Sequence, residues 1–415
     1  MKVDLERFLG TCSCGRPHNI SVKAIYIEAK ATRYLKELLR EYKNPVFVCD
    51  ANTKRASEEA LYEYFSQYKV IELTGENIHA DNDNVEKLSS KIEAKADIFI
   101  AVGSGTIHDL TRYVAFERSI PFISVPTAAS VDGFVSTVAA MTWNGMKKTF
   151  SSKAPIYVLA DTDIFSKAPY RLTASGISDL MGKYTALADW KISNILTNEY
   201  FCESIYDLEM EAVKEVESIL DKIKLGHEKS MEKLMYALIL SGLAMQMIGN
   251  SRPASGAEHH ISHLWEMGVI NEPIDALHGE KVSVGLILSL EKYGEILEAM
   301  ESNKCRVIDN SELELELLKD TFGKKGLYEE VLAENGESLL KSIELSKLEQ
   351  SFKAIALELN KLPKAGAMES RLKKAGCIVS MDQLNLPDIK RLTLALSPYV
   401  RRRLTFMRVS KLLSL

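Results

Sequence analysis

Four of the eight histidines lie close together in one stretch of the chain, at a spacing suited to binding a metal ion. His259 and His263 are four residues apart, so on a helix both imidazoles would project from one face, whereas His260 would point elsewhere. His278 follows shortly after them. Two imidazoles and one carboxylate make a site for a divalent cation with open coordination positions, and Asp179 in the upstream run TASGISDLMGKY offers the carboxylate.

The histidine spacing does not decide which two imidazoles bind the ion. Helix geometry favours His259 with His263 and leaves His278 outside, although Gly279 lets the backbone approach closely where His278 would reach inward. Each residue also has a plainer interpretation, because a buried histidine is usually only hydrogen-bonded and Asp179 could simply favour the dipole at the start of a helix. Three histidines followed by HGEKVSVG shift the balance toward a ligand site.

A second motif, GSGTIHD, follows the apolar run IFIAV and predicts a strand, a glycine turn and a helix. Gly103 and Gly105 free the turn from Cβ crowding, and the helix from Thr106 onward would direct its amide donors at a pyrophosphate. The motif lacks the full GxGxxG pattern, so a tight connection without any ligand is an equal alternative.

Polar groups at two other strand ends support a nucleotide site. Asp50 ends the run PVFVCD, where a carboxylate can accept hydrogen bonds from an adenosine ribose. Lys54 and Arg55 could accommodate a 2′-phosphate, so NAD is favoured over NADP only slightly. The run SVPTAASVDGF puts four more polar side chains at the end of the next strand and in the loop beyond it: Thr127, Ser130, Asp132 and Ser136.

The bulk properties exclude several classes of partner. A chain of 415 residues is expected to form two domains, because one core rarely covers that length. A net charge of −5 gives no general attraction to nucleic acid or anionic lipid. No window has the ~18 apolar residues of a membrane span. The acidic N-terminus is unlike a signal peptide, so we expect a cytoplasmic protein.

The six cysteines are mostly scattered, as expected for reduced thiols in a cytosolic enzyme. Cys12, Cys14 and His18 could form part of a metal knuckle. A structural zinc ion needs four ligands and no fourth is nearby in the sequence, so an ordinary loop or strand edge is favoured.

The pattern of elements divides the chain near residue 169. Before it, short β-branched runs alternate with helical windows, which is typical of a parallel sheet covered by helices. The predicted strands are 45–49, 70–73, 98–102, 121–125 and 156–159, and Asn144 with Gly145 predicts a hairpin. Helical windows follow, among them 203–224, 229–248, 282–300 and 339–359. The basic end YVRRRLTFMRVSK is expected to be a solvated helix face.

The fold class that follows is an α/β N-terminal Rossmann-like nucleotide-binding domain plus an all-α C-terminal domain. We expect residues 1–168 to form the dinucleotide-binding domain and residues 169–415 to form the helical metal- and substrate-binding domain.

Five motifs, in the same order along the chain, resemble the superfamily of iron-containing alcohol dehydrogenases, glycerol dehydrogenases and dehydroquinate synthases. Within it the chain is most similar to the bacterial sn-glycerol-1-phosphate dehydrogenases (AraM type). The motifs are GSGTIHD (103–109), PTAASVDGFVS (126–136), GISDLMGKY (176–184), SGAEHHISH (255–263) and LHGEKVSVG (277–285). The loop 268–276 departs from the pattern expected of the archaeal relatives, because the gap between the two histidine motifs is three residues longer.

The resemblance implies a role for each candidate residue. Asp179, His259 and His278 would hold one divalent metal ion, which is nickel, zinc or iron, and His263, Asp132 and Asp179 would face the substrate. The dehydroquinate synthase lyases carry a glutamate where Asp179 stands, which argues against that reaction. NAD(H) or NADP(H) would lie against Asp50, Gly103, Ser104, Gly105, Thr106, Ile107, Thr127, Ala128, Ala129, Ser130 and Ser136.

The activity implied is the reversible, metal-assisted reduction of dihydroxyacetone phosphate, and a homodimer is expected. His263 and Asp132 are the candidate catalytic residues: His263 would relay the proton and Asp132 would orient the substrate hydroxyls. Lys147, Lys148 and Arg252 are candidates for the phosphate, although each is more often a solvent-facing charge. A glycerol or other polyol dehydrogenase and a non-catalytic nucleotide-binding protein are the alternatives.

Overall fold

The structure, a computed structural model, describes residues 1–75, 78–224 and 226–415. The chain divides into two compact units, each built from several segments. Unit 1 consists of Met1–Asn144, Lys148–Leu180 and Glu211–Ser251, and unit 2 consists of Gly145–Lys147, Met181–Met210 and Arg252–Leu415.

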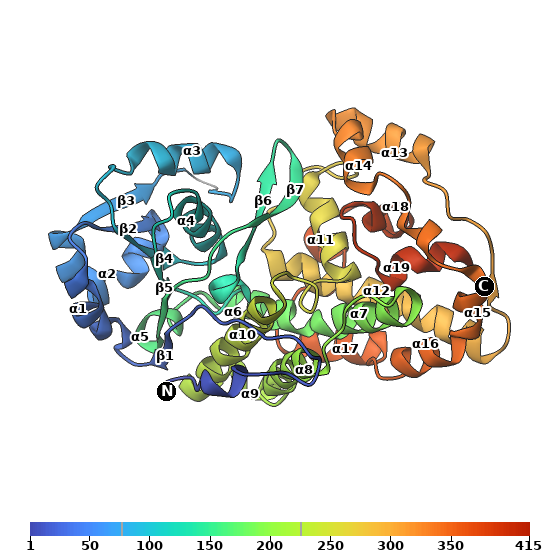
Figure 1. Cartoon of the computed structure of the whole chain (residues 1–415), viewed down its shortest axis with the longest axis horizontal. Helices are drawn as coiled ribbons and strands as arrows, with labels where there is room; N and C mark the ends of the chain where they lie inside the picture. The colour runs from blue at the N-terminus through green and yellow to red at the C-terminus, as the bar shows by residue number, and fades with distance from the viewer. Residues whose placement is uncertain (76–77, 225) are drawn as a thin grey trace. The chain divides into compact units, whose positions relative to one another are not determined.

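Unit 1 is built on a six-stranded sheet in the order β1-β8-β5-β4-β2-β3, and every neighbouring pair is parallel (Figure 1). Parallel strands need crossover connections, which here are helices, and the carboxyl ends of the strands therefore meet at one edge. The strands are β1 (Ala24–Glu28), β2 (Pro45–Asp50), β3 (Lys69–Leu73), β4 (Ile98–Gly103), β5 (Phe122–Pro126) and β8 (Tyr157–Asp161).

Helices cover both faces of this sheet. On one face, α3 (Asn82–Lys91) and α4 (Gly105–Glu117) pack Leu88 and Leu110 against Val46 and Phe99. On the other face, α1 (Leu35–Leu38), α2 (Ala51–Gln67) and α5 (Thr162–Phe165) form a second apolar layer. The predicted fold class is confirmed for this part of the chain, because a sheet buried on both faces needs the continuous apolar runs that the sequence shows.

The five predicted strands of the sheet all form, and so does the predicted hairpin. The hairpin pairs β6 (Val138–Trp143) with β7 (Met146–Ser151), and its turn residues Asn144 and Gly145 have φ values of 49° and 81°. Such left-handed angles are those of the turns that suit a hairpin twist. The sequence analysis did not predict β1, the edge strand, although its sequence AIYIE contains four consecutive apolar residues.

Unit 1 also contains α10 (Glu228–Ile248), which packs beside β1 and the short η4 (Gly133–Val135). Among the described residues, α10 is the helix long and apolar enough to cross a membrane, and 72% of its apolar window is buried inside the protein. That burial is the property of a core helix. Two further helices, α6 (Tyr170–Met181) and α8 (Glu203–Glu217), each begin in one unit and end in the other, and α9 (Leu220–Ile223) follows α8.

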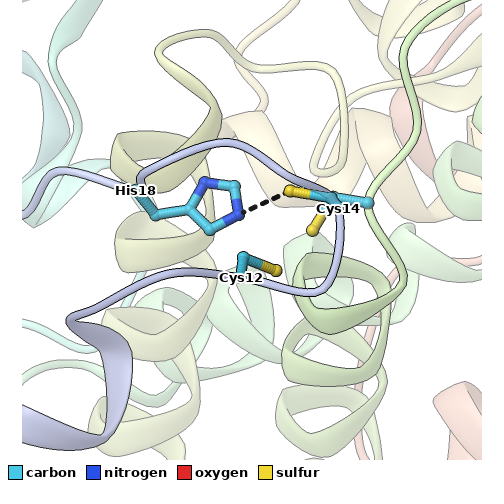
Figure 2. Close-up of side chains that lie close together, drawn as sticks. Cys12, Cys14 and His18 are labelled. Carbon is cyan, nitrogen blue, oxygen red and sulfur yellow. Dashed lines mark hydrogen bonds between the residues drawn. The ribbon is translucent and has the colours of Figure 1, made fainter.

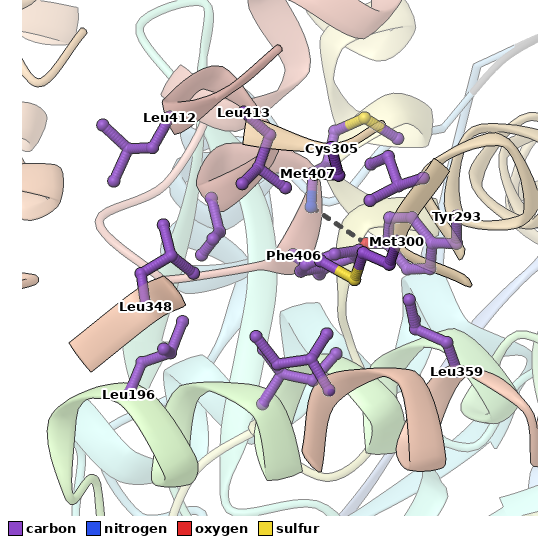
Figure 3. Packing of buried hydrophobic residues seen from close by; sticks show 14 of the residues in the cluster. Leu196, Tyr293, Met300, Cys305, Leu348, Leu359, Phe406, Met407, Leu412 and Leu413 are labelled. Carbon is purple, nitrogen blue, oxygen red and sulfur yellow. Dashed lines mark hydrogen bonds between the residues drawn. The ribbon is translucent and has the colours of Figure 1, made fainter. Parts of the chain in front are cut away.

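Unit 2 is helical apart from Met146 and Lys147 of β7 and a pair of two-residue strands, β9 (Arg306–Val307) and β10 (Leu413–Ser414). Its largest core gathers Leu196, Tyr293, Leu359 and Phe406 from helices far apart in sequence (Figure 3). The helices are α7 (Lys183–Thr197), α11 (Ala257–Met267), α12 (His278–Glu301), α13 (Leu315–Phe322), α14 (Tyr328–Asn335), α15 (Leu345–Gln350), α16 (Phe352–Leu359), α17 (Ala365–Lys374), α18 (Lys390–Leu396) and α19 (Phe406–Val409).

The helical windows are confirmed in type but not always in length. The window 229–248 coincides with α10, and 282–300 lies inside α12. The window 339–359 is instead three short pieces, with a 3-10 turn (Leu339–Ser342) followed by α15 and α16. The apolar spacing suits one helix, but Ile343 and Glu344 adopt extended backbone between the pieces and let them pack separately.

Candidate active site

The glycine turn closes the carboxyl end of β4. The strand ends at Gly103, Ser104 occupies the cap position and α4 begins at Gly105. A Cβ atom on Gly103 would lie 2.5 Å from the Cβ of Ile107, and one on Gly105 would lie 3.2 Å from Val131 Cγ2. Glycine is therefore required at Gly103 for close packing. The amides of the first turn of α4 lie at the carboxyl end of β4, a position at which helices can bind anions.

Two buried side chains fix the first turns of α4. The ring of His108 lies with Nδ1 2.9 Å from the carbonyl oxygen of Ser104 and Nε2 2.7 Å from Ser124 Oγ. Burial lowers the pKa of His108 to about 3, so the ring is neutral. Arg112, one turn later, donates to the carbonyl of Gly133. These contacts tie the glycine turn to the neighbouring strand and to η4.

Asp50 and Ser136, both expected at the cofactor, each satisfy local backbone amides. Asp50 Oδ1 accepts from the amides of Asn52 and Thr53 at 2.8 and 2.9 Å and caps α2. Both hydrogen bonds use the same carboxylate oxygen, Oδ1, so Oδ2 takes no part in capping the helix. Ser136 Oγ accepts from the amide of Val138 at 3.1 Å.

The loop 127–130, which follows β5, lies directly against α6. A Cβ atom on Gly176 would lie 2.2 Å from the carbonyl oxygen of Ala129, and Ser175 Oγ donates to the carbonyl of Ser130 at 3.2 Å. Only glycine permits this approach. All four residues of the loop are buried.

The two acidic candidates of unit 1 are neighbours. The amide of Asp132 donates to Asp179 Oδ2 at 3.1 Å, and Asp132 Oδ2 accepts from Ser241 Oγ of α10 at 2.9 Å. Asp179 is fully buried. It lies near the end of α6 and not near a helix start, because α6 already begins at Tyr170. The helix dipole disfavours a carboxylate there, so the dipole does not explain Asp179.

Three of the four clustered histidines face one another in unit 2. His259 and His263 lie on α11, and His278 is the first residue of α12. The ring centroids are 5.1 Å apart for His259 and His278, 6.0 Å for His263 and His278, and 6.1 Å for His259 and His263. The longer loop 268–276 therefore still brings His278 beside the other two. His260 is buried, and neither ring nitrogen has a hydrogen-bond partner among the described residues.

Carboxylates beside two of these rings distinguish them from the third. His259 Nδ1 lies 2.7 Å from Glu258 Oε1, and His278 Nδ1 lies 3.4 Å from Glu266 Oε1. An ionised carboxylate only accepts, so Nδ1 carries the proton and Nε2 presents its lone pair, as in histidines that bind metals. In the described part of the chain, Nδ1 of His263 has no such partner.

Two of the three facing histidines also form a possible ligand group with Glu266. Ligand atoms of His263, Glu266 and His278 fall within 4.8 Å of one another. Glu266 is, however, 2.9 Å from Lys147 Nζ and 3.2 Å from Lys281 Nζ. Burial would raise the pKa of Glu266, but these two ammonium groups hold it well below its usual range. A carboxylate already neutralised twice is better suited to orient His278 than to bind a cation.

The cations considered for a phosphate have different surroundings. Arg252 is buried and pairs with Glu199 at 2.9 Å, Lys147 pairs with Glu266, and Lys148 is exposed. Arg252 is thereby committed to holding unit 2 together.

The basic C-terminal run is not the solvated helix face that the sequence predicts. Arg401 and Arg408 are only 9% and 2% exposed, because the chain leaves α18 and turns inward before α19. Arg408 donates to Asn335 and lies over the ring of Tyr399. Within the described residues, Arg401 Nε has no partner. Burial lowers the pKa of Arg401 to about 10, so it stays cationic at neutral pH.

Sequence reasoning missed Glu258, Glu266 and Arg401. The two glutamates flank the histidines in the run EHHISHLWE, where a carboxylate next to a metal-binding histidine is a recognisable signal. The sequence around Arg401 does not indicate that this arginine is buried, because its burial depends on the side chains that pack around it in the fold.

Comparison with known proteins identifies the class of protein to which this fold belongs. A model of the family described as iron-containing alcohol dehydrogenase matches residues 26–169. In fold, the chain is similar to the crystal structure of glycerol dehydrogenase from Schizosaccharomyces pombe, with a TM-score of 0.54, 20% sequence identity, and coverage of 83% of this chain and 92% of that one.

Relatives of much higher identity narrow the class. The glycerol-1-phosphate dehydrogenase [NAD(P)+] of Geobacillus thermodenitrificans is 37% identical over 295 residues, which is 69% of this chain and 73% of that protein. The enzyme of the same name from Halalkalibacterium halodurans is 36% identical over 299 residues, or 69% and 75% of the two chains. This chain belongs to the glycerol-1-phosphate dehydrogenase family.

Proposed function

We propose that this protein is an NAD(P)-dependent, metal-dependent sn-glycerol-1-phosphate dehydrogenase that reversibly reduces dihydroxyacetone phosphate. The observation that carries the proposal is the pair His259 and His278, each with Nδ1 beside a glutamate carboxylate, which is buried for Glu258 and partly buried for Glu266. Family membership supplies the substrate and the cofactor class.

The metal ligands in this proposal are Asp179, His259 and His278. The donor set fits a divalent ion such as nickel, zinc or iron, since imidazole nitrogen and carboxylate oxygen suit all three. Asp179 lies near the end of α6, His259 lies on α11, and His278 is the first residue of α12. The bound ion supplies Lewis acidity that stabilises the negative charge on the reacting oxygen.

The cofactor position in this proposal is the carboxyl edge of the sheet. The amides after Gly103 and the glycine turn bind the pyrophosphate, and the second carboxylate oxygen of Asp50 accepts from the ribose. The close packing of Gly103 against Ile107 supports this position for the pyrophosphate, because it brings the end of β4 directly against the first turn of α4. The remaining contacts are assigned to Ser104, Gly105, Thr106, Ile107, Thr127, Ala128, Ala129, Ser130 and Ser136.

His263 and Asp132 act on the substrate in this proposal. His263 relays the proton that the reduced oxygen acquires, and relays it away again in the reverse direction. Asp132 orients a substrate hydroxyl through its carboxylate, which Ser241 steadies. Asp179 serves both the metal and the substrate.

Arg401 is our candidate for the substrate phosphate. Arg401 is buried and its Nε has no hydrogen-bond partner among the described residues, and a phosphate group can accept from the donors of a guanidinium in pairs. Arg401 also exerts the largest charge effect on the lowered pKa of His263, so it lies close to the histidine cluster.

The proposal includes the assignment of residues 1–168 to the cofactor and 169–415 to the metal and substrate. It also includes a homodimer in the cytoplasm.

The test is full-length protein assayed with dihydroxyacetone phosphate and either NADH or NADPH, together with elemental analysis. We expect turnover, and we expect His259→Ala and His278→Ala to lose the bound metal ion as well as activity. Dihydroxyacetone serves as the comparison substrate and separates this enzyme from a glycerol or other polyol dehydrogenase. Absence of turnover with the phosphate ester after metal reconstitution would refute the assignment.

A further inference from the structure

A second cluster of side chains that could bind a metal ion lies in the N-terminal loop of unit 1. An isolated bridge joins Thr11 to Pro17 and draws the ends of this loop together. Gly15, with φ at 78°, closes the turn, and its amide donates to the carbonyl of Cys12 at 3.0 Å. The loop carries Cys12, Cys14 and His18.

The three side chains point toward one another (Figure 2). Cys14 Sγ lies 3.4 Å from His18 Nε2, and the ligand atoms of all three residues fall within 4.8 Å of one another. An ion with tetrahedral bonds of about 2.3 Å to sulfur and about 2.0–2.1 Å to nitrogen would set sulfur and nitrogen roughly 3.6 Å apart. The observed spacing fits that ion.

The second ring nitrogen of His18 fixes the orientation of the first. His18 is buried, and its Nδ1 lies 2.9 Å from the carbonyl oxygen of Met247. A carbonyl oxygen only accepts, so Nδ1 carries the proton and the lone pair of Nε2 is directed at the two thiols. A metal-binding histidine almost always donates its other nitrogen in this way.

We propose that Cys12, Cys14 and His18 bind a structural zinc ion that is distinct from the metal ion of the proposed dehydrogenase site. Two thiolates and an imidazole favour zinc over the harder cations. The plain loop expected from the sequence rested on the lack of a nearby fourth ligand, but a side chain from outside the loop can take that position.

The contacts around His18 indicate what the ion does. Met247 and Gln246 lie at the end of α10, and Gln246 Oε1 accepts from the amide of Ser21 at 2.9 Å. Gln246 Nε2 donates to the carbonyl of Val135, next to the loop that carries Asp132. The zinc ion thus holds the N-terminal loop in the conformation in which His18 contacts the end of α10.

The experiment is elemental analysis and cobalt substitution on the full-length, reduced protein. The double variant Cys12→Ser/Cys14→Ser is expected to lose one equivalent of zinc and to keep the other metal ion. His259→Ala/His278→Ala should show the opposite pattern. With Co²⁺, a near-ultraviolet sulfur-to-metal charge-transfer band is expected in the unaltered protein and in the histidine variant, and it should be absent from the cysteine variant.

The control variants are single serine replacements of Cys49, Cys202, Cys305 and Cys377. A variant that keeps the zinc ion shows that the replaced cysteine is not a ligand. A variant that loses the zinc ion identifies the replaced cysteine as the fourth ligand. Either result supports the site. Absence of the charge-transfer band in unaltered, reduced protein overturns the proposal without relying on any variant, and so does an unchanged zinc content and an unchanged band in the folded cysteine variant. Neither measurement depends on dehydrogenase activity.

Discussion

The group beside Nδ1 distinguishes three imidazoles whose roles the spacing in the sequence does not decide. Glu258 holds His259 and Glu266 holds His278, whereas His263 has no acceptor at Nδ1 in the described part of the chain. We therefore expect His263→Asn to retain the metal ion while kcat falls by about 10²–10⁴-fold, the range for loss of a proton-transfer group. Elemental analysis and steady-state kinetics check this, with His278→Ala as the comparison. Loss of the metal ion from His263→Asn would instead make His263 a ligand.

A variant of Arg401 can show whether this residue acts in phosphate binding and not in the chemical step. If it binds the phosphate, Arg401→Ala removes a charge-assisted pair worth about 1.5–3 kcal/mol, which corresponds to a KM for dihydroxyacetone phosphate raised about 10–150-fold. Turnover of dihydroxyacetone should change far less. Arg391, exposed on α18, is the matched control, and Arg391→Ala should leave both KM values unchanged. An equal effect of Arg401→Ala on the two substrates would contradict the assignment.

At the scale of elements, the approach of α11 to α12 depends on one glycine. A Cβ atom on Gly285 would lie 2.5 Å from the carbonyl oxygen of Glu258, whereas one on Gly294, in the same helix, would meet nothing within 4 Å. We expect Gly285→Ala to cost about 1–3 kcal/mol and to weaken metal binding, because it displaces the backbone beside His259. Gly294→Ala should stabilise the protein by up to about 1 kcal/mol. Urea unfolding and metal titration compare the two, and equal stabilities would show that α11 and α12 separate without cost.

The elements also show how far the sequence could predict this fold. Strands such as β4 are encoded locally, because burial on both faces demands an unbroken apolar run, and the hairpin is encoded by Asn144 and Gly145. The break between α15 and α16 and the inward turn before α19 depend on packing partners from elsewhere in the chain. The histidines lie close together in the sequence, so their proximity could be predicted. The burial of Arg401 could not be, because it depends on those distant partners.

At the scale of the whole molecule, buried neutral histidines make stability depend on pH. The pKa of His108 is lowered to about 3 by burial, and the pKa of His260 and His263 is also well below its usual range for the same reason. An unfolded chain binds these protons near about pH 6.5, whereas the folded protein does not. The unfolded state therefore gains protons as the pH falls, and folding stability declines with it.

His108 lies outside the histidine cluster, so it tests this linkage cleanly. Between about pH 6.5 and 3 it should lower the free energy of unfolding by about 1.4 kcal/mol for each unit of acidification, and above that window it should contribute nothing. His108→Asn removes the titration, so between about pH 7.5 and 5 the variant should lose about 2 kcal/mol less stability than the unaltered protein. Urea unfolding at both pH values measures the difference. His227→Asn, at the exposed residue before α10, should reproduce the unaltered dependence. Parallel pH profiles for His108→Asn and the unaltered protein would mean that the His108 ring takes up its proton at the same pH in the folded and unfolded states.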